Sequence, residues 1–157
     1  PGRYAEFTKA YMDWYAKQES QLDLVPGFRK LLTNMHKDGR RLAIATGKSR
    51  AGVERVFKIT GVGDLFEAVQ TADTNFSKPN PMMLHSLADE SGLETTDMVM
   101  IGDSVLDMQM ASNAKADSVA MTYGASPADK LKQYASLGTA DNVEELAKIL
   151  NLTQYLE

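Results

Sequence analysis

The sequence predicts an α/β fold in which a parallel sheet of short strands carries helices on both faces. Short apolar runs, typical of buried strands, alternate along the chain with segments whose apolar residues recur at helical spacing. Glycines and prolines lie at the boundaries of these segments. The alternation of strand and helix occurs about four times, which is the pattern of parallel strands joined by helical crossovers. In such folds, ligands bind beyond the carboxyl ends of the strands.

The composition is that of one globular domain. The chain has 157 residues, of which 43% are hydrophobic and 24% charged, enough to form a hydrophobic core. No apolar run approaches the roughly 18 residues of a membrane span, and Pro1–Arg3 do not begin a signal peptide. The absence of cysteine excludes disulfides, thiolate metal sites and a cysteine nucleophile. We therefore expect a cytoplasmic protein, and the net charge of −4 disfavours nucleic acid as a partner.

The first half of the chain is predicted to begin with a helix over residues 7–17, whose aromatic face we interpret as core packing. The elements that follow are a helix from Phe28 to a stop at Gly39, a strand over 42–45, a helix over 50–59 and a strand over 67–71.

The second half continues the same alternation. The predicted elements are a helix from Pro81 to Ser91 ended by Gly92, a buried strand over 98–101, a helix through Val105 and Ala111, a strand over 117–121, a helix with Ser126 as N-cap and Pro127 at its first position, and a last helix capped by Asp141 or Asn142.

The first candidate site follows the strand over 42–45. The hydroxyl of Thr46, the amides of Gly47 and Lys48, and the start of a helix together suit a phosphate oxyanion. The alternative is an ordinary turn in which Ser49 caps the next helix.

The second candidate is Lys78, in a loop that continues as Pro79-Asn80-Pro81. Both prolines fix φ and stiffen the loop, so the ammonium is presented from a rigid frame and could neutralise a phosphoryl group and a nearby carboxylate. The alternative is a solvated surface lysine.

The third candidate is the pair Asp103 and Asp107. Asp103 follows the strand over 98–101. Asp107 comes four residues later, one turn into the predicted helix, so its side chain points to the same side of the helix as that of Asp103. Converging carboxylates are costly unless a cation or a lysine joins them, and hard oxygen ligands suit Mg²⁺. The alternative is that Asp103 only caps the helix.

In this order the three signals resemble motifs two, three and four of the haloacid dehalogenase-like hydrolase superfamily, and are nearest to its phosphoglycolate phosphatase-like branch. The resemblance covers nearly the whole chain and implies a three-layer Rossmann-like core over residues 23–157, preceded by the end of a helical cap over 1–22. It implies that Thr46 hydrogen-bonds the phosphoryl group, that Lys78 neutralises charge, and that Asp103 binds Mg²⁺. Asp107 would hold the metal site or orient the lysine. Family members tend to have glycine where this chain has Lys115.

One part of the family pattern is missing. The resemblance implies an Asp-x-Asp motif on a central strand, between the strands ending at Thr46 and Ile101, and the sequence contains no Asp-x-Asp. Three outcomes are open: the strand belongs to a longer protein, a separate copy or fragment supplies it, or the flanking strands close together. We favour the first, because the chain also lacks an initiator Met.

The expected function is Mg²⁺-dependent hydrolysis of a small phosphorylated metabolite through an aspartyl-phosphate, with this chain an incomplete and inactive part of a monomeric or homodimeric enzyme. The alternatives are a phosphomutase, a dehalogenase, a non-catalytic binding module of the same fold, and a signalling receiver-type domain. The carboxylate pair disfavours the dehalogenase, and the order of the motifs disfavours the receiver.

Overall fold

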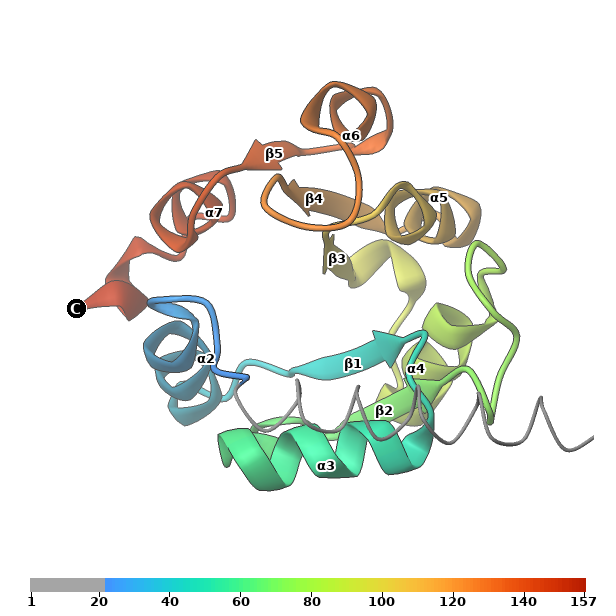
Figure 1. The fold of residues 1–157 in the computed structure, drawn as a ribbon, viewed down its shortest axis with the longest axis horizontal. Helices are drawn as coiled ribbons and strands as arrows, with labels where there is room; N and C mark the ends of the chain where they lie inside the picture. Colours follow the sequence, from blue (N-terminus) through green and yellow to red (C-terminus); the bar gives the residue numbers. More distant parts are fainter. Residues whose placement is uncertain (1–21) are drawn as a thin grey trace, which may run out of the picture.

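The computed structural model describes residues 22–157 (Figure 1). The predicted helix over 7–17 and nearly all of the predicted cap segment, 1–22, lie outside the described residues. The helices are α2 (Phe28–Lys37), α3 (Arg50–Thr60), α4 (Met82–Ser91), α5 (Val105–Ala114), α6 (Ala128–Tyr134) and α7 (Val143–Ile149). The strands are β1 (Ala43–Thr46), β2 (Ala68–Thr71), β3 (Val99–Gly102), β4 (Asp117–Met121) and β5 (Gly138–Ala140). Short 3-10 turns are η1 (Gly63–Leu65), η2 (Thr95–Asp97) and η3 (Thr153–Leu156).

The predicted fold class is confirmed. Strands alternate with helices along the chain, and every strand pair is parallel. The sequence analysis missed the short strand β5, whose three residues carry no apolar run. None of the helices within residues 22–157 is long and apolar enough to cross a membrane.

The sheet is divided into two parts. One part has the order β1-β2 and the other β3-β4-β5. Within residues 22–157 no ladder joins β1 to β3, so the alternative in which the flanking strands close together is wrong. Figure 1 shows the two parts of the sheet facing each other, with helices linking them on both sides.

The division also changes the burial of β3. This strand was predicted to be buried, but Val99 is 42% exposed and Ile101 38% exposed. Met100, on the opposite face of the strand, packs against the cluster formed by α4 and α5. Val99 and Ile101 stay accessible because the cavity next to β3 leaves their face uncovered.

One hydrophobic cluster links the divided sheet on the side of α4 and α5. Met83, Leu84 and Leu87 of α4 are buried with Met110 and Ala111 of α5. Alanines of β1 and β2 and the methionines flanking β3 pack against this cluster. Helix α4 therefore bridges the two parts of the sheet.

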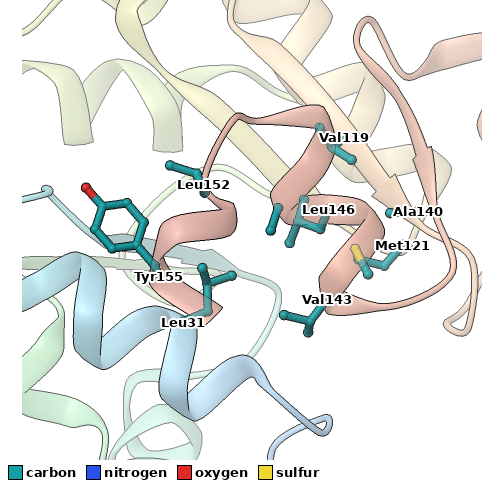
Figure 2. Close-up of a cluster of buried hydrophobic side chains, with 9 residues drawn as sticks. Leu31, Val119, Met121, Ala140, Val143, Leu146, Leu152 and Tyr155 are labelled. Carbon is teal, nitrogen blue, oxygen red and sulfur yellow. The ribbon is translucent and has the colours of Figure 1, made fainter. Parts of the chain in front are cut away.

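A second cluster links the ends of the described chain. Leu31 of α2 packs with Leu146 of α7 and with Tyr155 of η3 (Figure 2). The side chain of Asn34 donates a 3.0 Å hydrogen bond to the carbonyl of Tyr155, and the Tyr155 hydroxyl bonds to Asp38. This cluster holds α2, which leads into β1, against the segment that follows β5.

Helix α5 ends at a strained residue. Lys115 adopts φ 60°, in the left-handed region where glycine is favoured. The resemblance implied glycine at this position, and the positive φ of Lys115 is the backbone conformation in which glycine would be unstrained. Lys115 is exposed.

We predict that Lys115→Gly raises the free energy of unfolding by about 1 kcal/mol, because glycine removes the left-handed penalty. Urea unfolding of the purified chain measures this change. Lys58→Gly, at an exposed helical position of α3, is the matched control and is expected to lower stability by about 1 kcal/mol. A loss of stability in Lys115→Gly would contradict the assignment of strain.

Candidate active site

The candidate site lies where the carboxyl ends of the strands meet. Helix α4 runs from the Lys78 loop back toward the amino ends of the strands. Its last residue, Ser91, shows this, because the Ser91 carbonyl accepts a 2.5 Å hydrogen bond from Arg41, which lies just before β1. At the opposite end, Lys78 contacts Asp107 of α5, just after β3. The connection through α4 therefore places the carboxyl ends of β1 and β3 on the same side of the molecule.

The centre of the site is an ion pair. The Nζ of Lys78 lies 2.5 Å from Oδ1 of Asp107, and the two side chains are 15% and 7% exposed. The Lys78–Pro79 peptide bond is cis, and Asn113 of α5 donates a hydrogen bond to the Pro79 carbonyl, which ties the loop to the helix. The ion pair with Asp107 places the Lys78 ammonium beside the end of β3.

Asp107 also fixes the start of α5. Its Oδ2 accepts hydrogen bonds from the backbone amides of Asp103 and Ser104, both at 3.1 Å. Its own amide donates to the Ser104 hydroxyl, which completes a capping box. Both carboxylate oxygens of Asp107 are therefore engaged, one by Lys78 and the other by two backbone amides.

Glycine makes this contact possible. A Cβ atom on Gly102 would lie 2.4 Å from Oδ2 of Asp107, closer than any side chain allows. The glycine of the Gly-Asp sequence therefore has a steric reason: it lets the Asp107 carboxylate lie directly against the end of β3.

Asp103 is placed differently. It follows β3, lines the central cavity, and among the described residues no group donates a hydrogen bond to its carboxylate. Its side chain lies against Gly124, where a Cβ atom would come within 2.0 Å of Oδ2. Burial and the negative charge of Asp103 raise the pKa of the neighbouring Tyr123 hydroxyl above its ordinary value. Asp103 is thus an accessible carboxylate at a strand end.

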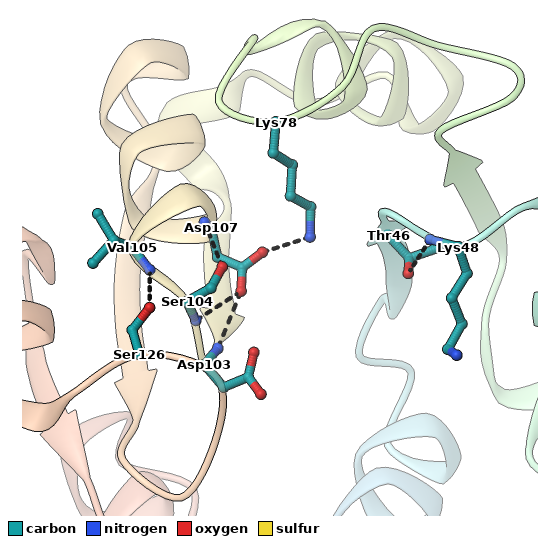
Figure 3. Close-up of polar contacts among 8 residues, drawn as sticks. All are labelled: Thr46, Lys48, Lys78, Asp103, Ser104, Val105, Asp107 and Ser126. Atoms are coloured by element: carbon teal, nitrogen blue, oxygen red, sulfur yellow. Dashed lines mark hydrogen bonds and ion pairs between the residues drawn. The ribbon is translucent and has the colours of Figure 1, made fainter. Parts of the chain in front are cut away.

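The Thr46 loop lies across the opening from the aspartates (Figure 3). The Thr46 hydroxyl accepts a 3.1 Å hydrogen bond from the Lys48 amide, which leaves its own proton available to an anion. The Ser49 hydroxyl caps α3 by accepting a hydrogen bond from the Gly52 amide, as expected from the alternative in which Ser49 is a helix cap. A Cβ on Gly47 would meet nothing within 4 Å, so the backbone there is open to a ligand.

The structure brings Lys78, Asp103 and Asp107 together and leaves Thr46, Gly47 and Lys48 on the facing loop. Figure 3 shows the Lys78 side chain extending into the space between the two groups.

Sequence reasoning missed the loop after β4, which supports Asp103 from a third strand end. Ser126 was predicted to cap α6, but Pro127 holds that position. The Ser126 amide instead donates to the Asp103 carbonyl at 3.1 Å, and its hydroxyl accepts from the Val105 amide at 3.0 Å. The signal available in the sequence was the position of Gly124 and Ser126 just beyond a predicted strand.

The residues present fit one part of a Mg²⁺ site. Residues 22–157 contain no cluster of three or more acidic or histidine side chains that could hold a metal ion. However, protein sites often bind Mg²⁺ through one or two carboxylates together with water and phosphate oxygens. Asp103 fits the role of such a ligand, whereas Asp107 is committed to Lys78 and to the capping box.

Comparison with known proteins identifies the family. A family model described as haloacid dehalogenase-like hydrolase matches residues 2–121. The chain belongs to the haloacid dehalogenase-like hydrolase family. It is 28% identical over 148 residues to a phosphoglycolate phosphatase of Vibrio parahaemolyticus, covering 93% of this chain and 65% of that protein. It is 31% identical over 132 residues to a phosphoglycolate phosphatase of Aliivibrio fischeri, covering 83% of this chain and 58% of that protein.

A solved structure supports the same fold. The chain superposes on a predicted phosphoglycolate phosphatase from Haemophilus somnus with a TM-score of 0.80 at 23% identity, covering 92% of this chain and 66% of that one. The chain spans less than two thirds of the length of each of the two phosphoglycolate phosphatases, from Vibrio parahaemolyticus and from Aliivibrio fischeri.

We predict that Asp107→Asn lowers the free energy of unfolding by about 3 kcal/mol, because it leaves the Lys78 ammonium shielded from water without a counter-charge. The double variant Asp107→Asn with Lys78→Met is expected to lose less than the sum of the single variants, and urea unfolding of all four proteins gives this coupling. The matched control is the exposed pair Arg41–Glu67 at 3.0 Å, where Glu67→Gln should cost less than about 1 kcal/mol. Additive losses at Lys78 and Asp107 would mean that the pair does not stabilise the site.

We also predict that Gly102→Ala destabilises the chain by about 1–3 kcal/mol, because the added methyl group collides with the Asp107 carboxylate. Gly47→Ala is the matched control, since its methyl group meets nothing and should change the unfolding free energy by less than about 0.5 kcal/mol. Equal effects of the two substitutions would rule out the close approach at Gly102.

Proposed function

We propose that these residues form the larger part of a Mg²⁺-dependent phosphatase that hydrolyses a small phosphate monoester through an aspartyl-phosphate. The observation that carries the proposal is the buried Lys78–Asp107 pair beside the accessible Asp103 carboxylate, at a strand end that faces the Thr46 loop. The names of the relatives make phosphoglycolate the first substrate to test.

Each residue has a role that follows from its position. Lys78 neutralises charge on the phosphoryl oxygens, and Asp107 holds the ammonium in place. The Thr46 hydroxyl donates its proton to a phosphoryl oxygen, while the Lys48 amide donates to the same hydroxyl and holds it in place. The Gly47 amide, whose surroundings are open, adds a further donor just before α3.

Asp103 would hold Mg²⁺, which when bound supplies positive charge to the phosphoryl oxygens. Gly124 would keep the space that the Asp103 carboxylate occupies. The arrangement suits phosphoryl transfer, in which positioning and charge neutralisation do most of the catalytic work.

The nucleophile is not among these residues. An aspartyl-phosphate requires an aspartate that attacks phosphorus, and the sequence has no Asp-x-Asp motif. We therefore expect the 157-residue chain by itself to release no phosphate from any ester.

The activity is tested in the longest natural polypeptide that contains these residues. We expect it to hydrolyse phosphoglycolate or another small phosphate monoester, and to lose this activity when EDTA removes Mg²⁺. Lys78→Met should lower kcat by about 10²–10³-fold, as expected for the loss of a group that stabilises the transferring phosphoryl. The released phosphate is measured colorimetrically over a panel of monoesters.

Lys132→Met, at an exposed position of α6, is the control and should leave kcat unchanged. Failure of the polypeptide to hydrolyse any ester of the panel, or full activity in EDTA, would overturn the proposal.

A further inference from the structure

The segment that follows β2 connects two loops of the candidate site. It begins at Thr71, which pairs in register with Thr46 across the β1–β2 ladder. It ends at Lys78, whose side chain extends into the space faced by the Thr46 loop, residues 46–49 (Figure 3). Both loops have a role in the proposed function, whereas the residues that join them have none.

One side chain of this segment, that of Asp73, contacts the start of α3. The backbone amide of Arg50, the first residue of α3, donates to both carboxylate oxygens of Asp73, at 3.0 Å and 3.1 Å. The Thr71 hydroxyl donates to Oδ1 of the same carboxylate at 2.6 Å, and Thr71 is fully buried. The Asp73 carboxylate therefore joins the end of β2 to the start of α3.

A backbone contact lies beside this carboxylate. The Ala72 amide donates to the Lys48 carbonyl at 3.2 Å, so the contact between the two chains continues past the ends of β1 and β2. Gly47 lies between the ladder, which ends at Thr46, and these contacts. The contacts therefore limit the directions in which the Gly47 amide and the Thr46 hydroxyl can point.

Asp73 is ionised where it makes these contacts. First the Thr71 hydroxyl and, less strongly, the Arg50 amide lower the pKa of Asp73 below its ordinary value. Hydrogen bonds to an ionised carboxylate are about twice as strong as bonds between neutral groups. Asp73 itself is exposed, so its effect falls on the loop and the helix start that it contacts rather than on a hydrophobic core.

The same contacts affect which donors a phosphoryl group can use. The first amide of α3, that of Arg50, is bonded to Asp73, and the amide two residues later is bonded to the Ser49 hydroxyl. On this loop, an anion therefore relies on the Thr46 hydroxyl and on the Gly47 amide. Both groups precede the helix, so the way in which the loop is held sets their direction.

We propose that Asp73 is a positioning residue: it holds the Thr46 loop so that the Thr46 hydroxyl and the Gly47 amide face the same phosphoryl group as Lys78. Asp73 acts through the loop and does not touch the substrate. This inference rests on the proposed function, because it assigns a residue that supports the same phosphate site.

The test measures binding of inorganic phosphate, in the presence of Mg²⁺, to the longest natural polypeptide that contains these residues. The shift of the Gly47 amide in ¹H–¹⁵N spectra gives the Kd. We expect saturable binding in the parent protein and binding about tenfold weaker in Asp73→Ala, which loses a charged acceptor. Asp73→Asn keeps an oxygen that can accept from the Arg50 amide, so its Kd should lie between the two.

Glu54→Ala is the matched control. Glu54 also contacts Arg50, but through the side chain, with 3.5 Å between Nε and Oε1, and both side chains are exposed. The control removes the same charge from the same helix and leaves the contact between Arg50 and Asp73 in place. Its Kd for phosphate should change by less than about twofold.

A double variant separates positioning from a general loss of stability. If Asp73 acts through the Thr46 loop, Asp73→Ala combined with Thr46→Val should weaken phosphate binding by less than the product of the two single effects. Thr71→Val, which keeps the volume of the buried side chain and removes its bond to Asp73, should weaken binding in the same direction as Asp73→Ala. Circular dichroism and Tm show whether each variant keeps the fold.

Four results would overturn the proposal. They are no shift of the Gly47 amide with phosphate in the parent protein, equal Kd values in Asp73→Ala and Glu54→Ala, fully multiplicative losses in the double variant, and tighter binding in Asp73→Asn. The last result would mean that the carboxylate only repels the anion.

Turnover of phosphate monoesters tests the proposed function separately. Hydrolysis by the parent protein together with unchanged phosphate binding in Asp73→Ala would leave the phosphatase proposal standing and overturn this one. Phosphate binding that depends on Asp73, in a protein that hydrolyses no ester, would do the reverse.

Discussion

Helix packing, rather than a continuous hydrogen-bonded sheet, holds the two halves of this molecule together. No ladder joins β1 to β3 within residues 22–157, so the connection depends on two hydrophobic clusters, one around α4 and α5 and one around α2 and η3. These clusters lie on opposite sides of the cavity between β1 and β3. The positions of all the strand ends, and therefore of the candidate site, depend on these contacts between helices.

The candidate site has a rigid side and an open side. On the rigid side, Asp107 contacts Lys78, caps α5 and lies against Gly102, so one carboxylate fixes a loop, a helix and a strand end. On the open side, the Thr46 loop is held by the Ser49 cap of α3 and by two contacts with the segment after β2. The Ala72 amide donates to the Lys48 carbonyl at 3.2 Å, and the Arg50 amide donates to the Asp73 carboxylate at 3.0 Å. The two sides face each other across the cavity between β1 and β3 (Figure 3).

Much of the fold could be predicted because short-range patterns in the sequence specify the strands and helices. Apolar runs marked β1 to β4, and the glycines at 61 and 92 marked the ends of α3 and α4. Prolines near Lys78 indicated a fixed lysine, and the spacing of Asp103 and Asp107 indicated a shared side. The strand β5 escaped detection because it has no apolar run. Ser126 was misassigned because a hydroxyl before a proline resembles a cap, whereas its partner Val105 is distant in sequence.

The sequence by itself determined the parallel α/β class, the family resemblance, and which residues stand at strand ends. These properties depend on short-range periodicity and on residue types that one strand, turn or helix dictates. Only the tertiary structure decided that β1 and β3 stay apart, that Val99 and Ile101 are accessible, and that Asp107 is occupied by Lys78 and two amides while Asp103 stays open. These properties depend on contacts between residues far apart in the chain, because the burial and the charge pairing of a side chain are determined by the strands and helices that pack around it.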